Sequence, residues 1–299
     1  MHNLSTILRK FTEITKTLAG NLVDKNGNVP RRGPKPMFSD VEVIALSMTQ
    51  EYQGIDSENM LFHQLSEYKE EIPNLISRRQ YNDRRKQTSD LSAKIRERMV
   101  LEIDGHENVF CIDSKPLPVC RLARYKRNKM GRGNYEKSPS LGHCAAQGMK
   151  YFGYKIHAVC GLNGTIHSFD LTKASVHDLN YTKDVKQMFN NCTIIGDKGY
   201  IGRQVQLDLF ESANIRLEVP YRKNQKDKKP CCAAFALARK RVETVFSQLQ
   251  DQFMIERNYA KAYMGYFTRI LAKITSFTIL QYINLINGKP IGRVKHALI

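Results

Sequence analysis

The hydrophobic pattern of this chain changes between residues 104 and 108, and this change most constrains the fold. Before it, apolar residues such as Leu4, Ile7 and Phe11 recur at helical spacing. After it, short runs rich in β-branched and aromatic residues predict five strands. The predicted strands are residues 108–113, 154–162, 164–172, 192–197 and 215–220.

The order of these strands predicts a mixed α/β sheet. Asn163-Gly164 joins the second strand to the third and is a strong signal for a tight hairpin. Helical patterns follow at 178–189 and 203–213, and a long helix begins near residue 233. A hairpin followed by strand–helix alternation favours a five-stranded mixed sheet flanked by helices. A last apolar helix, at about 268–287, contains too many polar residues for a membrane span, and we expect it to pack on the sheet as core.

The region 1–104 predicts several short helices. Ser39 with Glu42, and Ser77 with Gln80, form capping-box patterns that each open a helix. The second of these helices is strongly basic, which is typical of a helix-turn-helix-like DNA-binding region. A solvated basic helix on a helical cap is an equal alternative, because so few residues do not define that motif. The candidate DNA contacts here are Arg78, Arg79, Arg84 and Arg85.

The charge of the chain indicates a polyanionic partner. It has 47 basic and 29 acidic residues among 299, a formal net charge of +18. A chain this basic usually binds nucleic acid, and the alternative is a basic but inert surface. Residues 115–155 and 221–229 are the densest basic stretches, where we expect either phosphate contacts or a disordered solubilising loop. The first stretch contains the candidates Arg121, Arg124, Lys126, Arg127, Lys129 and Arg132.

The cysteine pattern and the first residues favour a cytoplasmic protein. The seven cysteines are odd in number and include no CxxC, which disfavours a disulfide framework or a zinc knuckle. The opening MHNLSTILRKFTEITK lacks the apolar segment of a secretory signal.

Two of the predicted strands end on an aspartate. NVFCID reaches Asp113, and TIIGD reaches Asp197 before a glycine turn. If these strand ends meet at one edge of the sheet, the two carboxylates need a cation or a shifted protonation state. Mg²⁺ is the natural hard cation for clustered carboxylates. Alone, an aspartate at a strand end is usually a turn or cap residue.

The helix FALARKRVETVFSQLQ carries a third carboxylate. Glu243 follows Arg239 by four residues, beside the apolar stripe of this helix. Taken alone, the two residues are better explained as an ordinary surface ion pair.

Together, these acidic residues resemble the catalytic triad of bacterial insertion-sequence transposases of the DDE type. Asp113, Asp197 and Glu243 are separated by 83 and 45 residues. IDSKPLP and IIGDKGY resemble the two aspartate motifs of that family, and RKRVETVFSQL resembles its glutamate helix. ASVHDLN resembles a recurrent His-Asp turn, where we interpret His177 and Asp178 as helix-capping residues. The resemblance covers roughly residues 105–290.

The resemblance implies an RNase H-like fold, shared with retroviral integrases, and a function in DNA transposition and recombination. It implies that Asp113, Asp197 and Glu243 hold two Mg²⁺ ions, or Mn²⁺ in their place. It further implies DNA contacts from Lys198 and Arg239, and a nucleoid-associated homodimer acting on the element's terminal inverted repeats and on target DNA. The expected domains are a helical DNA-binding region at 1–104 and a catalytic domain at 105–299.

The sequence departs from some relatives at two positions and leaves two alternatives open. Ala236 and Gln250 stand where those relatives have Tyr and Lys, so we expect no DNA contacts of that kind here. One alternative is a nuclease of the same fold that cuts DNA without joining it. The other is a DNA-binding protein without catalytic activity, which the presence of all three carboxylates disfavours.

Overall fold

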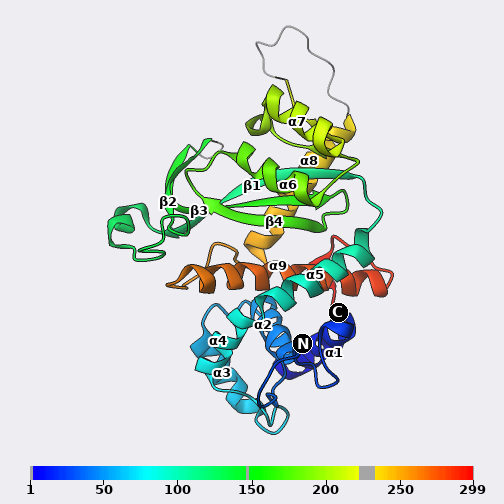
Figure 1. Cartoon of the computed structure of the whole chain (residues 1–299). Helices are drawn as coiled ribbons and strands as arrows, with labels where there is room; N and C mark the ends of the chain where they lie inside the picture. The colour runs from blue at the N-terminus through cyan, green and yellow to red at the C-terminus, as the bar shows by residue number, and fades with distance from the viewer. Residues whose placement is uncertain (1–2, 146–147, 222–232, 299) are drawn as a thin grey trace. The chain divides into compact units, whose positions relative to one another are not determined.

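The computed structural model describes residues 3–145, 148–221 and 233–298, which form two compact units (Figure 1). Residues 1–103 and 249–299 make a helical unit, and residues 104–248 make a unit built on a sheet. The predicted boundary at 104 coincides with the first change between units. The division differs from the expected domain 105–299 at its end, since residues 249–299 group with the N-terminal helices.

The helical unit begins with the helices that the sequence predicts. Both capping boxes are present: the Ser39 hydroxyl accepts from the Glu42 N–H, and Ser77 and Gln80 repeat the arrangement. These caps satisfy backbone donors that would otherwise lack partners at the helix starts. The helices are α1 (Leu4–Ala19), α2 (Asp40–Tyr52), α3 (Glu58–Leu65), α4 (Arg78–Gln87), α5 (Ser89–Asp104) and α9 (Tyr263–Ile286). Short 3₁₀ turns lie at Gly20–Leu22, Ser66–Tyr68 and Val294–His296.

Helix α9 is the central helix of this unit. It packs against α2 and α4 and belongs to the helical unit, not to the core of the sheet unit where we expected it. Its two buried cations share one partner: Arg269 Nε lies 2.9 Å from Glu51 Oε1, and Lys273 Nζ lies 2.6 Å from Glu51 Oε2. Among the polar positions that argued against a membrane span, Lys273 and Ser276 bind α2, whereas Thr275 and Thr278 donate to carbonyls of α9 itself. Within the described residues, no helix is long and apolar enough to cross a membrane.

The second unit is built on a mixed sheet. β3 (Met149–Gly161) pairs antiparallel with β1 (Val109–Cys120) on one side, and with β4 (Ile166–Lys173) and β2 (Ser140–Cys144) on the other. β1 then pairs in parallel with β5 (Cys192–Ile195), and β5 with β6 (Ile215–Glu218). The five predicted strands are confirmed, and β2 is an additional strand.

A tight turn joins two strands of this sheet, and helices pack against one of its faces. The β3–β4 hairpin turns at Gly164, whose φ of +91° favours glycine. The helical elements are η3 (Leu122–Arg127), η5 (Asp178–Tyr181), α6 (Thr182–Met188), η6 (Lys198–Tyr200), α7 (Arg203–Ala213) and α8 (Ala233–Asp251). Phe110, Ile112 and Ile194 of the sheet form one core with Val185 of α6 and Leu209 of α7.

Candidate active site

The strand register brings Asp113 and Asp197 to the same level of the sheet. In the parallel pair of β1 and β5, Cys111 lies opposite Ile195. Asp113 and Asp197 each follow this pair by two residues. Because the carboxyl ends of parallel strands meet at one edge, the two carboxylates lie close together, as predicted.

The strand carrying Asp113 does not end there, contrary to the prediction. β1 continues to Cys120 because its second half keeps its antiparallel pairing with β3, with Ser114 opposite His157 and Leu117 opposite Tyr154. Only the pairing with β5 stops, at Cys111. The edge at the active site is therefore made by the short β5 rather than by the end of β1.

The backbone after β5 turns tightly around Asp197. Its Oδ1 accepts a hydrogen bond from the Gly199 N–H at 2.7 Å, which caps the 3₁₀ turn η6. A Cβ on Gly199 would lie 2.9 Å from the same oxygen, and a Cβ on Gly196 would lie 3.2 Å from Ile112. Both glycines therefore leave little room for a Cβ, and neither has the positive φ that would make a turn its main role.

A third aspartate joins the first two. Asp178 Oδ1 lies 2.7 Å from Lys155 Nζ and accepts from Ser114 Oγ at 3.2 Å. Its Oδ2 lies 3.4 Å from the position of a Cβ on Gly199, beside Asp197. The proposed capping role is confirmed for His177, whose Nδ1 accepts from the Leu179 N–H, but Asp178 faces the site. We call Asp113, Asp178 and Asp197 the aspartate cluster.

The aspartate cluster is electrostatically strained at Asp113. Burial, together with the charges of Asp197 and Asp178, raises the pKa of Asp113 to about 7. The Ser114 N–H, which donates to Asp113 Oδ1 at 2.8 Å, and the Arg239 charge oppose this rise. Asp113 is thus a half-buried carboxyl whose negative charge is poorly compensated by its surroundings.

Helix α8 brings the third predicted residue to the other face of the sheet. Cys111 and Asp113 alternate with Phe110 and Ile112, so they face away from the core under α6 and α7. The charge of Arg239 on α8 acts on both of them, which places this helix on their face.

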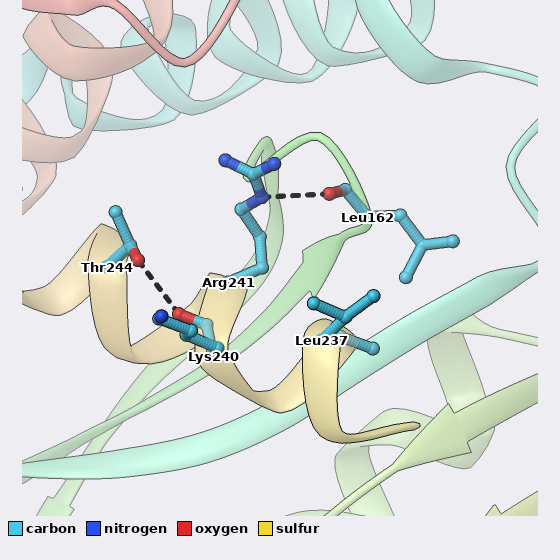
Figure 2. A pocket seen from close by; sticks show the side chains of 6 residues that line it. Leu162, Leu237, Lys240, Arg241 and Thr244 are labelled. Atoms are coloured by element: carbon cyan, nitrogen blue, oxygen red, sulfur yellow. Dashed lines mark hydrogen bonds between the residues drawn. The ribbon is translucent and has the colours of Figure 1, made fainter. Parts of the chain in front are cut away.

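The position of α8 is fixed at the hairpin between β3 and β4. Arg241 Nε donates to the Leu162 carbonyl at 3.0 Å (Figure 2). Beside this bond lies a pocket of about 520 Å³, lined by apolar Leu162 and Leu237 and by the polar groups of Lys240 and Thr244. The contact anchors the middle of the helix, and the buried Ala238, Val242 and Val245 confirm the predicted apolar stripe.

The donor set at the aspartate cluster suits a hard divalent cation. Carboxylate oxygens are the ligands such cations prefer, and a cation would relieve the repulsion at Asp113. The buried Tyr200 hydroxyl has no hydrogen-bond partner within the described residues. Burial, and then the charges of the three aspartates, raise the pKa of Tyr200 well above its usual value. Glu243, however, is exposed, and in the described chain no three Asp, Glu, His or Cys side chains are placed to hold a metal.

The predicted DNA contacts in residues 121–132 and at Lys198 are exposed. The six cations from Arg121 to Arg132 lie at the N-cap of η3, on η3 itself and in the loop after it, and all are exposed. This loop is ordered by packing: Met130 is buried, and the Tyr154 hydroxyl donates to the Lys137 carbonyl at 2.7 Å. Lys198 is exposed directly after Asp197, while residues 222–229 of the second basic stretch lie outside the described residues.

The four arginines predicted on α4 divide into two pairs. Arg78 and Arg79 are exposed. Arg84 instead binds Asp40 at 2.7 Å and the Phe38 carbonyl, and Arg85 binds Glu58 at 2.8 Å with only 5% of its side chain exposed. The second pair therefore holds the helical unit together, and we do not count it among the phosphate contacts.

The strand order, with Asp113 within β1 and Asp197 just after the neighbouring β5, is that of an RNase H-like domain. The chain belongs to the DDE transposases: the family model described as "Transposase DDE domain" matches residues 104–279. The matched region begins where the sheet unit begins and extends through α8 into α9. No curated protein and no solved structure was found to match the chain.

Proposed function

We propose that this protein is a DNA transposase that binds the ends of an insertion sequence, cleaves phosphodiester bonds there and joins the freed ends to target DNA. The observation that carries the proposal is the register of β1 and β5 in a chain of the DDE family. It brings Asp113 and Asp197 together beside the helix that bears Arg239 and Glu243.

In this proposal Asp113, Asp197 and Glu243 hold two Mg²⁺ ions, and Mn²⁺ serves in their place. When bound, such ions supply Lewis-acid polarisation of the scissile phosphate and lower the pKa of the attacking hydroxyl. Asp113 and Asp197 are supported as ligands by the register of β1 and β5, and the exposed Glu243 on α8 would be the third ligand.

The protein's own groups position the DNA. Arg239, half-buried beside Asp113, and the exposed Lys198 place positive charge where the scissile phosphate would bind. No protein nucleophile is required, because water frees a 3′-hydroxyl that then attacks target DNA in line. The cations of η3 and its loop contact backbone phosphates, which position the DNA without specifying its sequence.

The remaining elements of the proposal concern assembly. We propose that the helical unit recognises the terminal inverted repeats, with Arg78 and Arg79 among its contacts. The working form is a homodimer on DNA, located with the nucleoid in the cytoplasm, since two element ends must be processed together.

A strand-transfer assay with a labelled element end and a target plasmid tests the proposal. We expect Asp113→Asn, Asp197→Asn and Glu243→Gln each to abolish cleavage and joining while DNA affinity survives. Asp208→Asn, which removes an exposed partner of Lys186 in the same unit, is the matched control and should remain active. Cleavage without joining would favour the nuclease alternative, and wild-type protein that binds but never cleaves would favour the inactive one.

A further inference from the structure

The helical unit contains a polar groove that the catalytic proposal does not use. It has a volume of about 560 Å³ and is lined by α3, α4 and residues 259–262, which lead into α9. Five cations line it, against two carboxylates, Asp56 and Glu58. The cations are Arg78, Arg85, Lys86, Lys261 and Arg269.

The carboxylates of the groove are already neutralised by the protein. Glu58 binds Arg85 at 2.8 Å and accepts from Asn82 Nδ2 at 2.9 Å. Asp56 lies 3.8 Å from an Arg257 nitrogen at the margin. Arg78 and Lys261 are exposed, and neither has an ion-pair partner within the parts of the chain that the structure describes. The groove therefore has a surplus of positive charge at its accessible surface.

The two sides of the groove are fixed before any ligand binds. The buried Arg269 donates to Glu51 at 2.9 Å and to the Ile55 carbonyl at 3.1 Å, which ties α9 to α2 and to the segment before α3. Asn258 Nδ2 donates to the Tyr266 carbonyl at 2.9 Å and so shapes the turn that carries Lys261. A Cβ on Gly265 would lie only 3.9 Å from Lys86 Cε, so α4 and the start of α9 are close neighbours.

We propose that this groove binds the sugar–phosphate backbone of duplex DNA, with Arg78 and Lys261 as its principal phosphate contacts. Two segments separated by some 180 residues, one before and one after the catalytic sheet, would thus form a single binding surface. Asn59, Asn82 and Tyr259, which is 67% exposed, supply neutral hydrogen-bonding groups of the kind that meets phosphate oxygens. The inference rests on the proposed function, because it takes DNA as the polyanion.

The chemistry of the groove favours an extended polyanion over a small molecule. Small-molecule sites are lined mainly by apolar and aromatic groups with a few polar ones. Here charged and amide side chains predominate, and Tyr259 is the one aromatic side chain among the described residues that line the groove. The cations are also spread over two segments, which suits successive phosphates better than one compact anion.

The test is a salt titration of DNA binding by the full-length protein, followed by fluorescence anisotropy on a labelled duplex. The variant carries Arg78→Ala and Lys261→Ala, and the matched control carries Lys16→Ala and Lys69→Ala, which are exposed in the same unit but do not line the groove. Thermal unfolding verifies that both fold like the wild type. We expect affinity at 0.1 M salt to fall by about ten- to a hundredfold and the log–log salt slope to flatten by roughly two units in the groove variant alone.

The outcomes separate this inference from the proposed function. Strand transfer by wild-type protein, together with an equal salt slope for wild type, groove variant and control, would overturn the groove while leaving the transposase intact. A wild type that does not bind duplex DNA would overturn both. Equal losses in the variant and the control would show a diffuse electrostatic attraction and would also overturn the groove.

Discussion

Replacing Glu51 by Gln should destabilise the helical unit by about 3–5 kcal/mol. Glu51 is 2% exposed and lies between two buried cations, Arg269 Nε at 2.9 Å and Lys273 Nζ at 2.6 Å. Gln keeps the shape of the side chain but removes the charge, so two cations are left without a compensating anion. Whichever way the amide turns, its NH₂ group faces one of the two donors.

The pH dependence of this variant gives the result a distinctive signature. Burial already lowers the pKa of Lys273 from its usual 10.5, and without Glu51 it should fall further. The folded state then binds fewer protons than the unfolded state, so stability rises with pH until the unfolded lysine titrates as well. The cost of Glu51→Gln should therefore be largest near neutral pH and shrink as the pH approaches 10.

Amide hydrogen exchange in the full-length protein measures this cost separately in each unit. We expect faster exchange in α2 and α9 and little change in β1 and β3, because the ion pair lies wholly within the helical unit. Adding Lys273→Met should restore part of the lost stability, since the orphaned cation is then removed. A cost under about 1 kcal/mol, or an equal loss of protection in the sheet, would refute this account of α9.

Three further predictions follow from the sheet unit. Charge-neutral replacement of the six cations in residues 121–132 should weaken DNA binding by well over tenfold and flatten the salt slope by about three units, as a salt titration would show. Burial lowers the pKa of His157 to about 4, so the folded protein should lose about 3 kcal/mol as the pH falls from 6.5 toward 4; urea unfolding should show less loss in His157→Gln. A Cβ on Gly153 would overlap the Leu117 carbonyl oxygen, so Gly153→Ala should lower the melting temperature markedly by separating β1 from β3.

Local patterns in the sequence predicted most of what depends on local chemistry. The capping boxes at Ser39 and Ser77, the Asn163-Gly164 hairpin and the bounds of α7 at 203–213 are all confirmed. Each depends on residues within a few positions of one another, where turn and cap preferences are strong. The two aspartates were predicted for the same reason, since each closes an apolar run.

Local sequence patterns do not predict ion pairs between residues that are far apart in the chain. The apolar pattern of α9 indicated that the helix is buried, but not that Lys273 would meet Glu51, 222 residues earlier. Likewise, the basic run on α4 looked uniform, although Arg84 and Arg85 are used to bind Asp40 and Glu58. A dense run of basic residues indicates a DNA-binding surface only where no buried acidic residue binds the same cations.

The position of Asp113 shows why register decides a site of this kind. A shift of one residue in β1 would exchange the two faces of the strand and turn Asp113 toward the core that Ile112 now occupies. The pairing of Cys111 with Ile195 prevents this, and it also sets Asp113 level with Asp197. Because β5 then ends while β3 continues to pair with β1, the backbone at Asp113 is paired with β3 on one side and unpaired on the other. Asp113 is thus held by a continuous strand yet open toward Asp197, which is the combination of rigidity and access that its proposed role as a metal ligand requires.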